Sequence, residues 1–570
     1  MVLEKEDDGQ EMARLDEGSL VPALAIEMPN EKVGQTSSKK GGGWVTAPFI
    51  LGSSLASSIA SYGVTIDLLQ FLVRRFNISN IRASQITNII NSVTYLAPVA
   101  GAVLCDSYLG CFLTISVFTF ISFLGTSMLA VAAWLPSMAP PSCDGQLGSC
   151  KPSSPTQFAF LCLAFSVTTL GGAGTWFTYV TMGANQFDRK KEQERFVSYY
   201  FITTTVSTLV PSTVIVYVMD NVGWNWGYGL CAVLSAISLA LFLPAKWFCR
   251  DARPEGSPFI NLARVVVSAA RKIKFRLSVK KEDYCHGSGK HSDLTDSFSF
   301  VNKAALITGG DTHLDGSIAK RWRLCTIQEV EDLKTLIRLF PLWSTGIYLN
   351  IANAVQTNLT ILQSLAMDRS LGPSFKVPAA SFQVFSYISM GICLPLIDRF
   401  FYPFSRMLVR RPLTLLHRIG VGHVLVIVGL AAMACVEARR LQVMHQRGLA
   451  VAGDHLDAVV PMSALWLVLP LAILGAGSAF YLPDQVNLYY QEFPASLKNV
   501  GTSVCLLAVG IGYYLSTTVV RAVQKVTPWL TDDINSGRVD NVYWILAGLE
   551  GLNFLYYVLC AKLYKLQSSG

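Results

Sequence analysis

The feature that most constrains this chain is a series of apolar runs, each long enough to cross a bilayer. An α-helix needs about 20 consecutive apolar residues to span the hydrocarbon core, and backbone groups in lipid are satisfied only within helices or closed barrels. The runs lie near residues 44–73, 83–105, 112–135, 157–180, 198–219, 226–246, 332–354, 376–398, 412–436, 462–485, 500–522 and 540–563. Two sets of six, separated by a polar connection, predict an all-α membrane protein built of two six-helix bundles with 12 transmembrane helices.

The composition of the chain agrees with this class. Of its 570 residues, 51% are hydrophobic and only 15% are charged, whereas soluble domains carry about 25% charge. In a membrane protein the net charge of +8 matters through its distribution among loops, so we expect no nucleic-acid partner. The sequence contains no nucleophile–base pair, phosphate-binding loop or Cys/His group at metal-ligand spacing. We therefore expect no enzyme activity, no catalytic residue, no bound metal and no cofactor.

Charge patterning predicts the orientation and the domain boundaries. Lys and Arg gather in the central connection and in the sequence DRKKEQER after the fourth run, and such loops face the cytoplasm. The first residues are polar and lack a signal-peptide core. The predicted organisation is a disordered cytoplasmic tail (1–41), an N-terminal bundle (42–246), a cytoplasmic linker with an amphipathic helix (247–330), a C-terminal bundle (331–563) and a short cytoplasmic tail (564–570).

Two cysteines lie in a loop that this orientation places outside the cell or in an organelle lumen. Cys143 and Cys150 lie within the loop sequence SCDGQLGSC, after the third run. Disulfides persist in such oxidising compartments, so a bond between these two cysteines is predicted. The remaining cysteines lie mostly within apolar runs and are interpreted as small buried hydrophobes.

The first run is notable for the small residues it carries. Between Trp44 and Gly63 it has no charged residue, and Ser54, Ser57 and Ser58 recur at helical spacing. Small residues allow close helix–helix contact in a bundle. This run therefore predicts a weakly polar helix face inside the protein.

Ionisable groups within a membrane span are functional candidates by default. Asp106 ends the second run beside glycines, and we interpret it as a gating residue at the inner edge. Asp484 follows Pro483 just downstream of a glycine-rich stretch. A broken helix lining an aqueous path would tolerate it. It is equally compatible with a proton-coupling or cation site and with an exposed helix end, while Asp67 could simply reach the interface.

Neutral polar side chains are more numerous in the spans considered. Each serves either as a helix–helix contact or as a substrate contact, and the first role is the more common. The candidates are Asn88, Asn91, Tyr95, Tyr179, Asn353, Gln356, Asn358 and Asn487. The GGAG sequence at 171–174 lies within a span, without the strand that a nucleotide site requires, so close packing explains it better.

Several stretches together resemble one family. They are GGWVTAPF (42–49), ASYG (60–63), LCDSYLG (104–110), GANQFD (183–188), DNVGWNWGYGL (220–230), GSPF (256–259), VEDLKTLIRLFPLW (330–343) and DDINSGRVDNVYW (532–544). As a set they are similar to the plant nitrate and peptide transporter family, NPF, a branch of the proton-coupled oligopeptide transporters in the major facilitator superfamily. The sequences DRSLGP and FKVPAASFQVF (368–385) look most like the nitrate excretion transporters. The resemblance implies a major facilitator fold, alternating access and a binding site at mid-membrane.

The coupling residues that the resemblance implies are replaced here. The charged ExxER or ExxEK motif of the first helix would fall on Ser54, Ser57 and Ser58. The basic residue of the fourth helix would fall on Trp176, and the glutamate of the tenth would fall on Ser478. A histidine that contacts nitrate in one member would fall on Asn353.

These replacements predict an electrically bare central passage. Serine does not ionise usefully and tryptophan supplies no counter-charge, so the family's proton coupling is expected to be absent. The predicted function is transport of nitrate or a similar small anion, by facilitated diffusion or efflux. The predicted substrate contacts are Ser54, Ser57, Ser58, Asn91, Tyr95, Trp176, Asn353, Gln356 and Ser478.

Alternatives to this function remain open at the level of the sequence. The substrate could be a plant metabolite such as a glycoside or hormone, since Trp176 suits stacking against a larger ring. Protons could be coupled through Asp484 or Asp67, or the chain could be a non-transporting sensor. The expected partners are the small-molecule or anion substrate and the lipid bilayer, with a homodimer as a further alternative. The plasma membrane is the expected location and the vacuolar membrane the alternative.

Overall fold

The computed structural model places most of the chain in long helices. It describes residues 42–141, 152–250, 258–278, 280–286, 294–313, 318–373, 375–401, 407, 414–447, 459–492, 501–531 and 533–568. The predicted tail over 1–41 and the predicted disulfide between Cys143 and Cys150 lie outside the described residues.

The described part of the N-terminal half contains six membrane-length helical segments, some of which are interrupted. Its helices are α1 (Ala47–Ile66), α2 (Leu68–Phe76), α3 (Asn80–Leu104), α4 (Cys111–Trp134), α5 (Pro155–Ala173), α6 (Trp176–Ala184), α7 (Lys190–Val210), α8 (Val216–Asn221) and α9 (Trp224–Phe242). Asp67 separates α1 from α2, and a π-helical segment (Pro211–Ile215) separates α7 from α8. A proline cannot supply the helical N–H, which accounts for the second interruption.

The described part of the C-terminal half contains six further long helices, and the linker helices precede them in the sequence. The linker holds α10 (Pro258–Arg271) and α11 (Ser299–Asn302). The half itself consists of α12 (Ile327–Leu365), α13 (Gln383–Leu396), α15 (Leu415–Gln446), α16 (Val468–Glu492), α17 (Gly501–Val526) and α18 (Val539–Ser568). Four short strands cap it: β1 (Met367–Asp368) pairs in parallel with β4 (Val460–Ser463), and β2 (Ser370–Leu371) pairs antiparallel with β3 (Phe375–Lys376).

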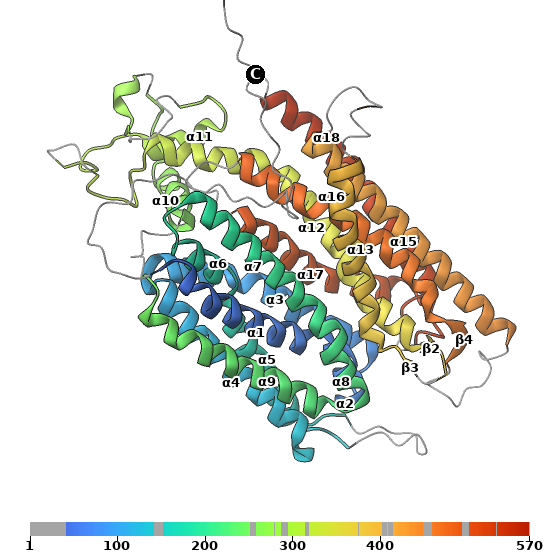
Figure 1. Ribbon diagram of the computed structural model, residues 1–570. Coiled ribbons are helices and arrows are strands. Elements are labelled where there is room, and N and C mark those ends of the chain that lie inside the picture. Colours follow the sequence, from blue (N-terminus) through green and yellow to red (C-terminus); the bar gives the residue numbers. More distant parts are fainter. Residues whose placement is uncertain are drawn as a thin grey trace, which may run out of the picture.

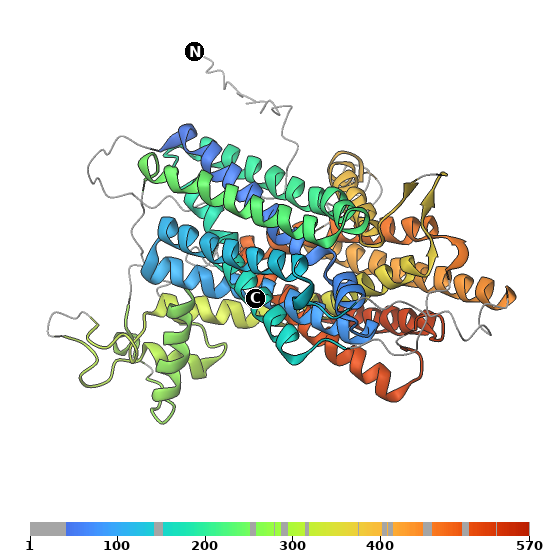
Figure 2. The ribbon, with the colours of Figure 1, turned by 90° about the horizontal axis from the view of Figure 1, so that it is seen from below.

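Among the described helical segments, 11 are long and apolar enough to cross a membrane. The remaining long helix, α12, has 39 residues and runs through the bundle beside them (Figure 1). The predicted all-helical membrane fold is therefore confirmed. Figures 1 and 2 show the linker helices at one end of the bundle and the strands at the other. We call these the linker end, which the charge pattern predicts to be cytoplasmic, and the far end.

Glycines allow the helices of the N-terminal half to pack backbone against backbone. A Cβ placed on Gly171 would lie 2.3 Å from the backbone nitrogen of Ser122 on α4, and one on Gly101 would lie 2.0 Å from the carbonyl oxygen of Ala173. The chain then breaks at Gly174, so that α6 begins at Trp176. The GGAG sequence serves close packing, as its position within a span predicted.

This packing can be tested with two adjacent glycines. Gly171→Ala is expected to destabilise the protein by about 1–3 kcal/mol, because the added methyl group must push α5 away from the backbone of α4. Gly172→Ala is the matched control, since a Cβ there meets nothing within 4 Å. Thermal unfolding of the purified variants measures the difference. Equal unfolding temperatures for the two variants would contradict the described α4–α5 contact.

A buried ion pair stabilises the linker. The Lys272 ammonium lies 2.9 Å from Asp311 and donates to the carbonyl oxygen of Leu306 at 2.5 Å. Burial by itself opposes the charge of Asp311, but hydrogen bonds from Thr308 and Lys272 outweigh this effect and hold the pKa of its carboxyl below the ordinary value. This pair fixes the end of α10 against the segment that leads into α12.

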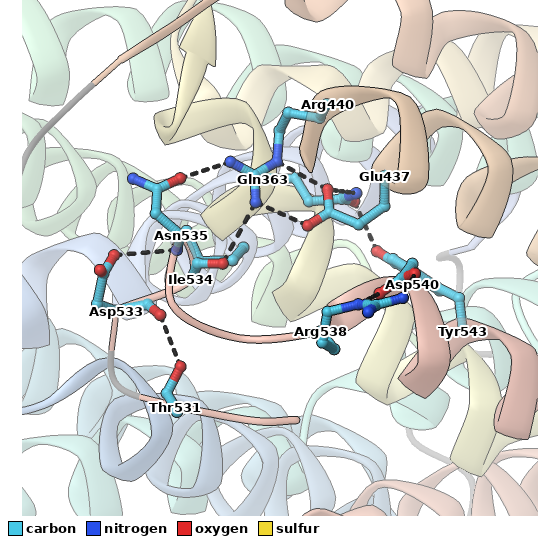
Figure 3. Close-up of polar contacts among 10 residues, drawn as sticks. All are labelled: Gln363, Glu437, Arg440, Thr531, Asp533, Ile534, Asn535, Arg538, Asp540 and Tyr543. Atoms are coloured by element: carbon cyan, nitrogen blue, oxygen red, sulfur yellow. Dashed lines mark hydrogen bonds and ion pairs between the residues drawn. The ribbon is translucent and has the colours of Figure 1, made fainter. Parts of the chain in front are cut away.

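A fully buried ion pair holds three parts of the C-terminal half together near the far end (Figure 3). Arg440 on α15 donates to both carboxylate oxygens of Glu437, at 2.8 and 2.7 Å, and neither side chain is exposed. Gln363 on α12 donates to Glu437 at 2.7 Å and accepts from Tyr543 on α18 at 2.7 Å. Arg440 also donates to Asn535 at 2.6 Å, in the loop before α18. The network therefore fixes α12, α15 and α18 relative to one another.

Candidate functional site

Six aromatic side chains meet where the two halves of the bundle face each other. We call them the central aromatic cluster: Tyr62 on α1, Tyr95 on α3, Trp176 on α6, Tyr200 on α7, Tyr387 on α13 and Tyr513 on α17. The Trp176 ring lies 6.0 Å from that of Tyr62 and 5.7 Å from that of Tyr95. Tyr95 in turn stacks against Tyr513 of the other half, at 5.6 Å. Of the six, only Tyr200 is fully buried; the others keep part of their surface accessible.

The described contacts of the cluster are with neutral groups. The Tyr200 hydroxyl donates to the carbonyl oxygen of Trp176 at 2.9 Å and interacts with Ser54. The Tyr62 hydroxyl interacts with Thr208. Hydroxyl groups therefore surround the rings, and the site can offer hydrogen bonds and stacking surfaces to a solute.

The serines of α1 form hydrogen bonds with side chains that pack beside the cluster. Ser53 bonds to the Tyr179 hydroxyl at 2.7 Å and to Ser238 on α9 at 2.9 Å. Ser54 and Ser57 are buried, and Ser57 interacts with the same Tyr179 hydroxyl. Small hydroxyl side chains thus form a network of neutral hydrogen bonds at the positions where the resemblance would place a charged motif.

Helix α12 brings two predicted polar residues to different places. Asn353 has an exposed side chain one turn from Thr357, which interacts with Tyr513 of the cluster. Residues four apart share a helix face, so Asn353 lies on the side of α12 that meets the cluster. Gln356 is buried and donates to Thr360 on its own helix at 2.7 Å, while its Oε1 atom has no described partner.

The other predicted contacts are less closely tied to the cluster. Asn91 lies one turn before Tyr95 on α3 and is half-buried, and Ser58 is a half-buried neighbour of Ser57 on α1. Ser478 is half-buried on α16 and donates to the carbonyl oxygen of Leu474. For these three residues a substrate contact stays a prediction.

The two predicted acidic residues lie toward the linker end. Asp484 on α16 is buried and lies 3.5 Å from Arg418 on α15, so it belongs to an ion pair within the C-terminal half. Asp106 belongs to a π-helical segment (Cys105–Leu109) that precedes Gly110. Its side chain lies outside the described part of the structure. Proton coupling through Asp484 and gating by Asp106 stay predictions.

Polar contacts join the two halves on the far-end side of the cluster. Asn358 on α12 donates to Asn88 on α3 at 2.8 Å, and Ser92 donates to the carbonyl oxygen of Gly510 on α17 at 2.8 Å. Closer to the far end, Arg369 lies 3.5 Å from Asp220, at the end of α8. These contacts hold the N-terminal and C-terminal halves together in this conformation.

Sequence reasoning missed two groups of residues. Four members of the central aromatic cluster were not singled out: Tyr62, Tyr200, Tyr387 and Tyr513. Nor were four ionisable residues of α15 and α18: His423 and Glu550 inside the ninth and twelfth runs, and Glu437 and Arg440 just after the ninth run. For His423 and Glu550 the signal was available, because each is an ionisable residue in a membrane-length apolar segment. For the tyrosines no signal was available, since their meeting depends on how six helices pack.

The helical fold and the neutral site between two facing halves define a membrane transporter of the major facilitator type. Similarity to other proteins supports this. Residues 112–535 match the model of the POT family, described as PTR2. The chain is similar to the solved structure of the POT family transporter PepTSo, with a TM-score of 0.66 at 18% identity, over 92% of this chain and 99% of that one.

Sequence relatives place the chain more closely. It is 41% identical to Protein NRT1/ PTR FAMILY 2.3 of Arabidopsis thaliana, over 95% of this chain and 97% of that protein. It is 40% identical to Protein NRT1/ PTR FAMILY 2.7 of the same plant, over 93% and 94% of the two chains. The chain belongs to the NRT1/PTR family, the NPF branch of the POT transporters, as its sequence motifs predicted.

Proposed function

We propose that this transporter moves nitrate or a similar small, planar anion through the central aromatic cluster. The observation that carries the proposal is the neutral, hydroxyl-rich character of the cluster. A weakly hydrated monovalent anion needs few hydrogen bonds to replace its water. The Tyr62 and Tyr95 hydroxyls, Ser58 and the Asn353 amide would supply them, and the Trp176 ring would cover one face of the ion.

The mechanism proposed is alternating access without a proton-coupling group in the central site. In a coupled transporter, a carboxylate changes its partner when it is protonated, and this change drives the cycle. Ser54, Ser57 and Ser478 carry no charge that could act in this way. Transport would then follow the electrochemical gradient of the substrate, in either direction, and efflux from the cell is included. The plasma membrane is the proposed location.

The aromatic surface favours a second candidate substrate. A planar organic solute could stack on the rings of this cluster, where Tyr95 lies 5.7 Å from Trp176 and 5.6 Å from Tyr513. Such contacts add about 0.5–1.5 kcal/mol each beyond burial. A plant glycoside or hormone with a flat ring is therefore the alternative, and its polar groups would meet the same hydroxyls.

A flux measurement tests the function directly. We expect purified protein in liposomes to equilibrate labelled nitrate across the membrane, and to accumulate none above equilibrium when a proton gradient is imposed. A mixture of plant metabolites supplied in the same assay tests the organic alternative. Accumulation that strictly requires the proton gradient would contradict the uncoupled mechanism, and transport of metabolites alone would replace the anion as substrate.

A further inference from the structure

A histidine and a glutamate face each other in the interior of the C-terminal half, away from the central aromatic cluster. His423 Nδ1 on α15 lies 2.6 Å from Glu550 Oε1 on α18, and the two side chains are 0% and 1% exposed. Ionisable groups at such depth are costly and mark functional positions by default. The transport path proposed above leaves this pair without a role.

The chemistry of the pair favours the binding of one proton. With one proton the pair is neutral overall, either as imidazolium and carboxylate or as imidazole and carboxylic acid. Removing that proton would leave an uncompensated carboxylate in the core, which is strongly unfavourable. A second proton would give the pair a net positive charge, which the buried surroundings disfavour in the same way.

Described polar groups connect the pair with the start of α15 at the linker end. The Tyr557 ring on α18 lies 4.9 Å from the His423 ring, and its hydroxyl donates to the carbonyl oxygen of Leu416 at 2.6 Å, at the start of α15. The Arg418–Asp484 ion pair lies near the same helix start. In the far-end direction, Val426, Leu430 and Leu546 belong to the apolar core.

The other groups that face His423 are few. Besides Glu550 and Tyr557 on α18, the Tyr481 ring on α16 lies 6.1 Å away. Helix α12 meets the pair through its backbone, because Asn553 donates both to Glu550 at 3.2 Å and to the carbonyl oxygen of Thr345 at 3.0 Å. The pair is therefore linked to α12 through the Asn553 amide and, by way of Tyr481, through the Asn350 amide, which donates to the Tyr481 hydroxyl at 3.2 Å.

The segment of α12 that Asn553 holds is suited to bending. Pro341 lacks the helical N–H, and side chains back-bond to carbonyl oxygens in the next turns: Ser344 to Pro341, Thr345 to Leu342 and Asn350 to Gly346. Helices kink where proline or competing side chains interrupt the backbone ladder. The same helix carries Asn353 toward the central aromatic cluster.

We propose that His423 and Glu550 form a proton-binding site that senses pH at the linker end and sets the rate at which α12 moves. This inference rests on the proposed transport function. When α12 bends at Pro341 and leaves α15 and α18 at the linker end, water reaches the pair, and a higher pH on that side removes its proton. Closing the helices again requires the proton back. Because it leaves and returns on one side, no net proton transport results.

Two measurements on full-length protein in liposomes test the site, with nitrate as the probe and pH set separately on each side. Raising the pH at the linker end from 6 to 8 is expected to lower wild-type flux by at least about fivefold, within the limit of tenfold per pH unit for one proton. The same change at the far end should have no effect. Glu550→Gln is expected to give a flat profile, while the control His445→Asn, which removes an exposed histidine from the same helix α15, keeps the wild-type slope.

Thermal unfolding supplies a readout that does not depend on transport. Because the proposal has the folded pair hold a proton that the unfolded chain gives up to water, wild-type stability should fall as the pH rises from 6 to 8. This loss should be absent in Glu550→Gln, or in the His423→Asn/Glu550→Gln double variant if the single variant folds poorly. A pH-independent wild type, or an unchanged slope in the variants, overturns the proposal. Absence of nitrate flux at every pH refutes nitrate as the substrate instead, and leaves the thermal-unfolding test of the site unaffected.

Discussion

Glu437→Gln is expected to destabilise the protein by about 3–5 kcal/mol, the cost of leaving one member of a buried ion pair without its partner. The Arg440 guanidinium donates two hydrogen bonds to the Glu437 carboxylate, and neither side chain is exposed to solvent. A neutral amide at position 437 cannot balance that charge. It also places an N–H donor beside a guanidinium that offers only donors.

Thermal unfolding of purified protein in detergent measures this effect. Two further variants serve as a control and as a test of charge balance. Arg439→Gln removes an exposed arginine next to Arg440 and should leave the unfolding temperature almost unchanged. The double variant Glu437→Met/Arg440→Met removes both charges and should recover part of the loss. If Glu437→Gln unfolds at the same temperature as the Arg439 control, the buried network does not have the strength assigned to it.

Trp176→Lys is expected to change substrate preference more than any other single substitution in the central aromatic cluster. A lysine there introduces a cation among tyrosine hydroxyls, so the apparent affinity for nitrate should rise several-fold. It also removes the ring that approaches Tyr62 and Tyr95. Uptake of any planar organic solute should therefore fall about tenfold, which corresponds to the loss of one aromatic contact of roughly 1.4 kcal/mol.

Trp176→Phe is the matched control, because it keeps an aromatic ring without adding charge. Its nitrate affinity should stay near that of the wild type. Competition of nitrate and organic solutes against labelled nitrate, measured in the same liposomes, compares the three proteins. If the lysine variant binds nitrate no better than the phenylalanine variant, then nitrate does not occupy the space beside residue 176.

The sequence by itself determined the class of protein. Membrane-length apolar runs leave the backbone no alternative to helices, and the central polar connection over 247–330 divides them into two sets. The local signals were equally direct at the GGAG sequence, where glycine permits the contact between α5 and α4. Motifs such as GANQFD and LCDSYLG pointed to the family that the comparisons then established.

Only the tertiary structure decided which polar residues meet. Tyr62 and Tyr513 are hundreds of positions apart in a chain with many tyrosines, and no spacing rule connects them. The sequence also suggested a passage free of charge, and the described contacts of the cluster fit that idea. Yet His423 and Glu550 form a buried ionisable pair between α15 and α18, away from the cluster. Hydropathy fixes where a chain crosses the membrane, but the helix faces that turn toward each other depend on side-chain packing across the whole bundle.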